Sequence, residues 1–394
     1  MKRFGLLLFL LLTGSFSLFG QRYLTPQFSF VTHTGNIGYG RSTTYQNVDE
    51  NLLLDWYEPA SDTATKRPLI IYIHGGGFTD TNQTRSLVHI FAYCDSLAVR
   101  GYAVASIDYR LDTSISNRAV INALHDAKAA VRYFKRLSSA YRIDTSLIFI
   151  AGESAGGVTA LNVAYLDQTS ELAYPPVGPY PADTSLEGNS GSPGFSSNVK
   201  AVMALCAGTQ TSTNELLFDT SAIQSANDPP LLMMHGSSDA NIPFARAVEI
   251  AQRANNLSLG NLFYALPGAV HCPWFFPLPN NAAYMDTLIA STVPFLYACV
   301  LTGATNVSPE IPENSMLAYP NPSNGELHIA LPTAITEQLE ITLFDLAGKL
   351  VFKHSQYPDG RNLSYDLSHL AKGSYILKVL GEEGFTANQR IVLK

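Results

Sequence analysis

Short apolar runs alternate with amphipathic segments through the first three quarters of the chain. Near-continuous apolar runs predict strands buried on both faces of a sheet, at 52–57, 68–74, 103–108, 147–151, 199–206, 231–235 and 262–266. Apolar residues at helical spacing predict helices at 87–100, 119–137, 158–164 and 246–256. Because these strands and helices alternate, the pattern predicts an α/β fold with a doubly wound, mostly parallel sheet.

The alternation of predicted strands and helices is interrupted between residues 166 and 198, where prolines, glycines, serines and tyrosines accumulate. This pattern is typical of a long insertion that is ordered mainly by packing. Two interpretations are equally open. The insertion forms one wall of an active-site mouth, or it is a surface excursion without a functional role.

A second break near residue 304 predicts a linker at 305–316 and a different kind of domain after it. From 317 to 394 the pattern contains strands only, separated by turn residues. They are expected at 326–331, 339–345, 349–354, 374–380 and 387–393. Several short strands with turn signals predict a small all-β sandwich.

The first 20 residues have the pattern of a secretory signal peptide. Lys2 and Arg3 precede a short apolar run at 4–12, and small residues follow it. A buried N-terminal helix is the alternative. Beyond residue 20, no stretch is expected to be long and apolar enough to span a membrane. The α/β domain is therefore expected at 21–304.

Composition limits the classes of partner. The formal net charge is −7, and 46% of the residues are hydrophobic against 14% charged. No basic stripe is present, so nucleic acid and anionic membranes are poor partners. The four cysteines fit no metal motif. Cys206 is expected to be a small core residue, and Cys272 and Cys299 could pair, although the sequence leaves the pairing open.

The hexapeptide Gly-Glu-Ser-Ala-Gly-Gly at 152–157 lies between a predicted strand and a predicted helix. This arrangement is a nucleophile elbow, in which Ser154 stands on a sharp turn whose neighbours must be small. The serine needs donors for the oxyanion of acyl transfer. The run His-Gly-Gly-Gly-Phe at 74–78 ends another strand of the same predicted sheet. The backbone N–H groups of Gly76, Gly77 and Ala155 are therefore the expected oxyanion hole.

The serine also needs a histidine that is oriented by a carboxylate. His271 follows the last predicted strand and is the expected base, whereas His74 and His235 are expected to be structural. Asp239 follows the strand at 231–235 and is the expected acid. Asp228 precedes that strand and so lies at the wrong end of a parallel sheet. The alternative for Asp239 is a turn or helix cap.

These motifs in this order resemble those of carboxylesterase-type α/β hydrolases, a group that includes hormone-sensitive-lipase-like and bacterial carbohydrate esterases. The resemblance covers about residues 50 to 300 and includes the run Asp-Tyr-Arg-Leu at 108–111. It implies that Ser154 is the nucleophile, Asp239 the acid and His271 the base. Glu153 departs from the aspartate that many hormone-sensitive-lipase relatives carry, which leaves the subgroup open.

The C-terminal module resembles a type IX secretion sorting domain. The supporting runs are Ala-Tyr-Pro-Asn-Pro at 318–322, Phe-Asp-Leu-Ala-Gly-Lys at 344–349 and Leu-Ala-Lys-Gly-Ser-Tyr at 370–375, with a terminal lysine. The resemblance implies a secreted or cell-surface protein whose partner is the type IX secretion machinery. A carbohydrate-binding β-sandwich is the alternative.

Together these features predict a secreted serine carboxylic-ester hydrolase that needs no metal or organic cofactor. The expected substrates are small esters or acyl groups, such as acetyl or feruloyl, on extracellular polysaccharide. A serine peptidase of the same fold and a non-catalytic binding protein on the same fold are the alternatives.

Overall fold

The computed structural model describes most of the chain. The described residues are 22–172, 181–209, 218–275, 281–301, 317–319, 323, 325–331, 336–345, 349–358, 362–382 and 385–393. The expected signal peptide at 1–20 and the expected linker at 305–316 lie outside them.

The centre of the fold is an eight-stranded sheet with the strand order β1-β2-β4-β3-β5-β6-β7-β8. Its strands are β1 (Val31–Thr43), β2 (Asp49–Pro59), β3 (Arg67–Ile73), β4 (Ala103–Ile107), β5 (Ile143–Glu153), β6 (Ala201–Leu205), β7 (Leu231–Gly236) and β8 (Asn261–Leu266). The hairpin of β1 and β2 joins β4 in antiparallel pairing, and every other neighbouring pair from β4 to β8 is parallel. The predicted mostly parallel sheet is confirmed.

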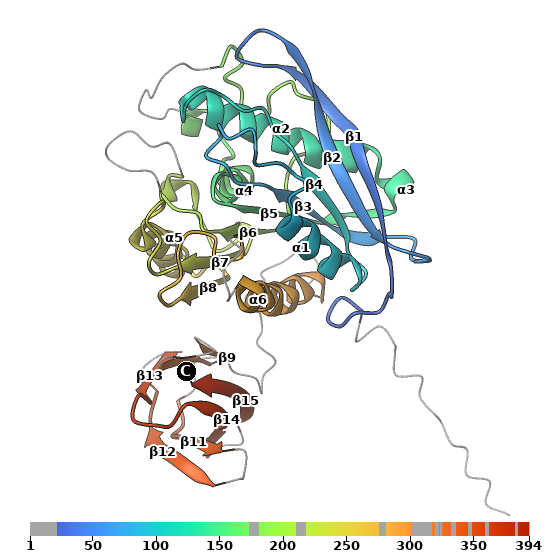
Figure 1. Cartoon of the computed structure of the whole chain (residues 1–394). Coiled ribbons are helices and arrows are strands. Elements are labelled where there is room, and N and C mark those ends of the chain that lie inside the picture. Colours follow the sequence, from blue (N-terminus) through green and yellow to red (C-terminus); the bar gives the residue numbers. More distant parts are fainter. Residues whose placement is uncertain are drawn as a thin grey trace, which may run out of the picture.

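Helices pack on both faces of this sheet (Figure 1). They are α1 (Val88–Ala98), α2 (Asn117–Arg136), α3 (Ser138–Tyr141), α4 (Ala155–Tyr165), α5 (Phe244–Asn256) and α6 (Asn281–Leu301). In β3, Ile71 and Ile73 belong to the buried cluster that includes α2, α4 and α5, whereas Ile70 and Tyr72 belong to the one that includes α1 and α6. Successive side chains of a strand point to opposite faces, so a strand covered twice must be apolar throughout.

The long helix α6 corrects one expectation. By length and composition, Asn281–Leu301 is apolar enough to cross a membrane, with a mean hydropathy of 1.4 in its most apolar window. The expectation that no stretch beyond residue 20 has this property was therefore wrong. In the fold, Leu288, Phe295 and Leu296 of this helix are buried in the core beside α1. Part of the apolar character of α6 thus belongs to the face that packs on the sheet.

The insertion at 166–198 is described except for residues 173–180. Its second half packs along α2. Glu187 accepts hydrogen bonds from Lys128 and Arg132 of that helix at 3.0 and 2.7 Å, and the Ser185 carbonyl lies 2.6 Å from Nε2 of His125. The described part of the insertion is therefore fixed to a helix by partly buried polar contacts.

The C-terminal part contains two antiparallel sheets around one buried cluster. Their strand orders are β13-β10-β9 and β12-β11-β14-β15. The strands are β9 (Leu317–Tyr319), β10 (Glu326–Ala330), β11 (Leu339–Asp345), β12 (Leu350–Gln356), β13 (Asn362–Asp366), β14 (Gly373–Gly381) and β15 (Thr386–Leu393). The five predicted strands and the all-β class are confirmed, and the short strands β9 and β13 were missed.

Candidate active site

Ser154 stands at the turn between β5 and α4 in a strained backbone conformation, with φ 52° and ψ −120°. Such a turn requires small neighbours. A side chain at Gly156 would collide with the backbone carbonyls of Ile73 and His74, and one at Gly152 would collide with the carbonyl of Gly156. The glycines of the elbow are thus required because β3, β5 and α4 pass one another at close distance.

The structure brings Ser154, His271 and Asp239 together. Nε2 of His271 lies 2.8 Å from the Ser154 hydroxyl oxygen, and Nδ1 of His271 lies 2.6 Å from Oδ2 of Asp239. The three residues follow β5, β8 and β7 respectively, at the carboxyl ends of parallel strands. Residues 32 and 117 positions apart meet because those strand ends share one edge of the sheet.

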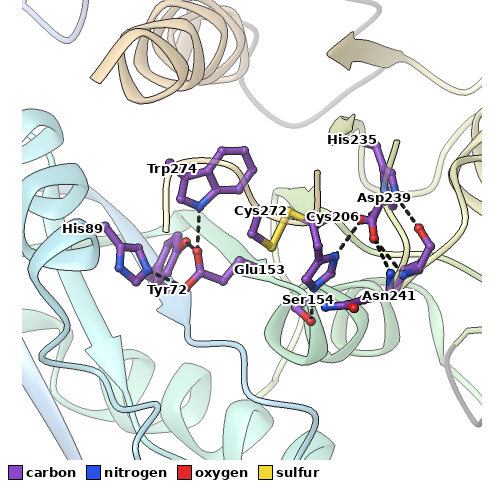
Figure 2. Close-up of a disulfide and its surroundings, with 12 residues drawn as sticks. Tyr72, His89, Glu153, Ser154, Cys206, His235, Asp239, Asn241, Cys272 and Trp274 are labelled. Atoms are coloured by element: carbon purple, nitrogen blue, oxygen red, sulfur yellow. Dashed lines mark hydrogen bonds and ion pairs between the residues drawn. A yellow bond between two sulfur atoms is a disulfide. The ribbon is translucent and has the colours of Figure 1, made fainter. Parts of the chain in front are cut away.

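Asp239 is buried and receives donors on both carboxylate oxygens. Its Oδ1 accepts hydrogen bonds from the backbone N–H groups of Asn241 and Ile242, each at 2.9 Å. Its Oδ2 faces His271 and, at 3.1 Å, Nε2 of His235 (Figure 2). Burial alone raises the pKa of this carboxyl, but the hydrogen bonds from His235, His271 and Ile242 outweigh it and hold the pKa well below its usual range. Asp239 therefore caps a turn and orients His271 at the same time.

The loop after β3 presents Gly76 and Gly77, whose φ angles are +107° and +58°. Gly76, Gly77 and Ala155 all border the space in front of Ser154. None of their three backbone N–H groups donates a hydrogen bond to another described residue. Free N–H groups at this position can stabilise negative charge on a bound oxygen atom.

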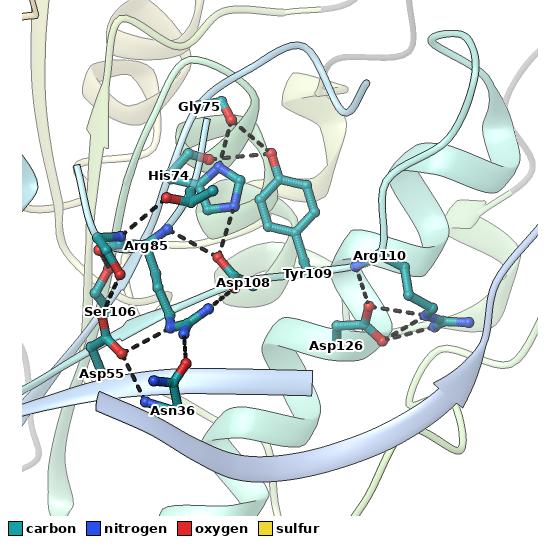
Figure 3. A network of polar contacts seen from close by, with 12 residues as sticks. Asn36, Asp55, His74, Gly75, Arg85, Ser106, Asp108, Tyr109, Arg110 and Asp126 are labelled. Atoms are coloured by element: carbon teal, nitrogen blue, oxygen red, sulfur yellow. Dashed lines mark hydrogen bonds and ion pairs between the residues drawn. The ribbon is translucent and has the colours of Figure 1, made fainter. Parts of the chain in front are cut away.

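The run 108–111 holds this loop in place. The Tyr109 hydroxyl lies 3.0 Å from the Gly75 carbonyl oxygen and 3.2 Å from that of His74. Arg110 makes a buried ion pair with Asp126 of α2, in which Nη2 of Arg110 lies 2.8 Å from Oδ1 of Asp126 (Figure 3). Arg110 thus attaches the chain next to Tyr109 to α2, and from there Tyr109 supports the loop that carries Gly76 and Gly77.

Asp108, Asp55 and Arg85 form a second support for the same loop. Arg85 donates to Asp55 at 2.9 Å, and its guanidinium also contacts Asp108 (Figure 3). Nε2 of His74 lies 3.6 Å from Asp108. Burial lowers the pKa of His74 although Asp108 opposes this shift, so the imidazole is neutral near pH 7 and its Nδ1 donates to the Gly75 carbonyl at 2.7 Å. His74 is structural, as predicted.

A cavity of about 330 Å³ lies in front of Ser154. Its lining includes the apolar Phe78, Ile115 and Phe275 and the polar Asp80, Gln83 and Asn241. None of the described residues of the insertion at 166–198 contributes to this lining. For the described residues of this insertion, the structure thus favours a surface excursion over a wall of the active-site entrance.

Glu153 is the residue of this region whose role the sequence did not reveal. Its side chain has no exposed surface. Its carboxylate oxygens accept hydrogen bonds from the Tyr72 hydroxyl at 2.7 Å, from Nε1 of Trp274 at 2.9 Å and from Nε2 of His89 at 2.9 Å (Figure 2). Burial and the carboxylate together raise the pKa of Tyr72 well above its usual range, so the phenol stays protonated and donates. The only signal in the sequence was a charged residue at the end of an apolar strand, because its partners come from distant segments.

The cysteines depart from the expectation. A disulfide joins Cys206, directly after β6, to Cys272, directly after His271, with the Cα atoms 5.6 Å apart. Cys206 is buried as predicted but is not a free core thiol, and Cys272 does not pair with Cys299, which is free and buried.

A cluster of possible metal ligands lies at the same place, since ligand atoms of Cys206, Cys272 and His271 lie within 4.8 Å of one another. These atoms do not suit a metal ion, because the two sulfur atoms are bonded to each other and both ring nitrogens of His271 have protein partners.

The other titratable residues weighed from the sequence are structural. Asp228 accepts hydrogen bonds from the backbone N–H groups of Gln224 and Ser225 at 2.6 and 3.0 Å, within a turn before β7. Nε2 of the buried His235 lies 2.8 Å from the Ile242 carbonyl oxygen. Asp228 lies at the opposite end of β7 from Asp239, as predicted.

The mixed sheet with its covering helices, and the elbow at the end of β5, define an α/β-hydrolase fold. The family model BD-FAE matches residues 54–254, slightly more than half of the chain, and the chain belongs to this family. Residues 317–394 match the model described as a secretion system C-terminal sorting domain. That domain marks a secreted or cell-surface protein.

Curated relatives and solved structures are consistent with this assignment. Esterase LipC of Mycobacterium tuberculosis is 27% identical over 241 residues, which are 57% of this chain and 57% of that protein. The probable carboxylic ester hydrolase LipM of the same organism is 25% identical over 66% of this chain and 59% of its own length. The chain thus spans less than two thirds of these relatives.

Solved structures that are similar to this chain share the fold. Thermogutta terrifontis esterase 2 has a TM-score of 0.54 and 21% identity, and the match covers 72% of this chain and 98% of that one. A truncated carbohydrate esterase from gut microbiota has a TM-score of 0.51 and 22% identity over 69% and 97% of the two chains. At this identity the likeness concerns the fold.

Proposed function

We propose that this protein is a secreted serine carboxylic-ester hydrolase with Ser154, His271 and Asp239 as its catalytic triad. The observation that carries the proposal is the continuous hydrogen-bonded line from the Ser154 hydroxyl through both nitrogens of His271 to Oδ2 of Asp239. A serine hydroxyl becomes a nucleophile when an oriented imidazole accepts its proton.

The reaction begins when Ser154 attacks the ester carbonyl carbon and His271 takes the hydroxyl proton on Nε2. Asp239, charged at neutral pH, stabilises the imidazolium that forms. His271 then gives the proton to the departing alcohol. Water repeats the sequence on the acyl-enzyme, with His271 again as base, and releases the carboxylic acid.

The negative oxygen of the tetrahedral intermediate lies among the N–H groups of Gly76, Gly77 and Ala155. In support of this, all three residues border the cavity together with Ser154, and the two glycines have the positive φ angles that residues with a side chain rarely adopt. Loss of one such donor typically lowers kcat by about 10²–10³-fold.

The substrates are small esters or acyl groups on extracellular polysaccharide. The cavity has both apolar residues, which suit a short acyl group, and polar residues at Asp80, Gln83 and Asn241, which suit a hydroxylated alcohol. Thermogutta terrifontis esterase 2, which shares the fold, was solved with propionate and with butyrate bound. The C-terminal sorting domain makes the type IX secretion machinery the partner during export.

Hydrolysis of p-nitrophenyl butyrate by four proteins tests the proposal: wild type, Ser154→Ala, Asp239→Asn and the control Ser146→Ala. Ser146 is an exposed serine near the other end of β5. Ser154→Ala and Asp239→Asn should lower kcat by about 10³-fold or more, and the control should equal wild type. Wild-type activity in Ser154→Ala would overturn the triad.

Substrate class is tested with natural polymers. Acetate release from acetylated xylan and ferulate release from arabinoxylan distinguish an acetyl from a feruloyl esterase. Hydrolysis of a peptide p-nitroanilide without ester hydrolysis would instead support the peptidase of the same fold.

A further inference from the structure

The segment at 267–275, which we call the histidine segment, carries His271 on irregular backbone after β8. Its backbone hydrogen bonds lie on either side of His271. The Gly268 N–H group donates to Oγ of Ser237 at 2.7 Å, the Ala269 N–H group to the Leu266 carbonyl at 3.2 Å and the Phe275 N–H group to the Cys272 carbonyl at 2.9 Å, and the Ala269 carbonyl accepts from the Ser238 N–H group at 2.9 Å. Among the described residues, the backbone groups of Val270 and His271 have no such partner. Val270, directly before His271, is 42% exposed. Side-chain contacts must therefore contribute to the position of His271.

The first of these contacts is the disulfide, which fixes the segment one residue after His271. Its other half, Cys206, is attached to β7, because its N–H group donates to the Met234 carbonyl at 2.8 Å. The residue before it, Leu205, accepts a hydrogen bond from the Ser154 N–H group at 2.8 Å. The disulfide thus links the base to the strand end that holds the nucleophile.

The second contact is the indole of Trp274, whose Nε1 donates to Glu153 at 2.9 Å. Glu153 precedes Ser154 directly, so this contact also leads back to the elbow (Figure 2). Cys206, Cys272, Trp274 and Glu153 are all at most 1% exposed. Two buried anchors therefore lie within three residues of His271, and both end beside Ser154.

We propose that the Cys206–Cys272 disulfide, together with the hydrogen bond from Trp274 to Glu153, is a positioning clamp that holds His271 within hydrogen-bond distance of Ser154. Full activity therefore requires the oxidised protein. This inference rests on the proposed function above. Both cysteines act through His271 and touch no substrate. A misplacement of about 1 Å in a catalytic group can lower the rate 10²-fold, so a covalent anchor beside the base matters.

The clamp forms by a balanced redox step. The two thiols lose two electrons and two protons to a disulfide oxidant, the sulfur–sulfur bond forms, and the oxidant is reduced to two thiols. This reaction is favoured outside the cytoplasm, and the sorting domain directs the chain there. The chain would be weakly active before export and fully active after it.

The test compares Cys206→Ala/Cys272→Ala with the matched control Cys94→Ala/Cys299→Ala, which removes the two free buried cysteines. With p-nitrophenyl butyrate well below the melting temperature, kcat of the first variant should fall by about 10- to 100-fold with KM within about twofold. The control should keep kcat within about twofold. A folded Cys206→Ala/Cys272→Ala protein with wild-type kcat would overturn the clamp.

If Cys206→Ala/Cys272→Ala does not fold, wild-type protein refolded in dithiothreitol tests the clamp instead. It should show four titratable thiols instead of the two of the oxidised form, with lowered kcat that returns on reoxidation with oxidised glutathione. A reduced protein with four thiols and full kcat also overturns the proposal. Activity in Ser154→Ala would refute the triad itself, whereas an inactive Ser154→Ala beside a fully active disulfide variant refutes only the clamp.

Discussion

Nε2 of His235 lies 3.1 Å from Oδ2 of Asp239, the same oxygen that faces His271. The Ile242 carbonyl oxygen lies 2.8 Å from the same nitrogen. Since both neighbours are acceptors, Nε2 of His235 carries a proton and donates to them. His235 is thus structural, as the sequence indicated, but its structural role is to hold the proposed catalytic acid.

Replacement of His235 by phenylalanine should lower both the unfolding free energy and kcat. His235→Phe removes one of the two donors that face Oδ2 of Asp239 and the donor that faces the Ile242 carbonyl oxygen, and the loss of such a buried donor costs about 1–3 kcal/mol. Chemical denaturation should show that loss, and kcat should fall less than in Asp239→Asn. His235→Gln, which can keep an N–H donor near the same place, should recover part of both. Equal stability of His235→Phe and wild type would contradict this role.

Acid should weaken the contribution of Asp239 to stability. The folded pKa of this carboxyl lies below its value in the unfolded chain, so its stabilisation is complete above the unfolded value of about 4 and is lost as the pH falls toward the folded one. The difference in unfolding free energy between wild type and Asp239→Asn should therefore shrink below about pH 4. A difference that stays constant between pH 7 and pH 3 would refute the lowered pKa.

The hydroxyl of Tyr109 should matter more for catalysis than for folding. Tyr109→Phe removes the donor to the carbonyls of His74 and Gly75 and loosens the glycine loop. We expect kcat to fall by about tenfold with KM nearly unchanged, because the N–H donors act mainly on the transition state. Tyr133→Phe, whose hydroxyl pairs with Tyr141 instead, is the control. A similar kcat in both variants would show that the loop needs no such support.

The charge on Glu153 should be required for stability. In Glu153→Gln, the amide nitrogen would have to face one of three donors, from Tyr72, Trp274 and His89. The unfolding free energy should fall by about 1–3 kcal/mol in a denaturant titration. Glu50→Gln, at an exposed position of β2, should change it by less than about 0.5 kcal/mol. A Glu153→Gln protein as stable as wild type would mean that the site accepts a neutral partner.

The close approach at the elbow should make Gly156 irreplaceable. In Gly156→Ala, the added methyl group collides with the carbonyl oxygens of Ile73 and His74, and the unfolding free energy should fall by about 3 kcal/mol. At Gly38, a methyl group meets nothing within 4 Å, so Gly38→Ala should change stability by less than about 1 kcal/mol. Similar melting temperatures for the two variants would argue against the packing described.

Much of the fold and of the candidate site could be predicted because the relevant signals are local. Apolar runs mark strands that are covered on both faces, and the rule that ligands gather at the carboxyl ends of parallel strands selected Asp239 over Asp228. The same rule predicts that His271, Gly76 and Gly77 lie near Ser154. The helix α6 was not predicted because apolar residues occupy most of its positions, so no amphipathic stripe marks it as a helix.

The sequence by itself thus determined the order of elements from β2 to β8 apart from the short α3, the elbow around Ser154 and the residues that meet it at the sheet edge. Only the tertiary structure decided that Cys206 joins Cys272 and that Glu153 gathers Tyr72, His89 and Trp274. Those partners lie up to 121 positions apart in the chain. The physical reason is that periodicity reports which face of an element is buried, whereas the partner of a buried thiol or carboxylate depends on which distant elements the fold packs beside it.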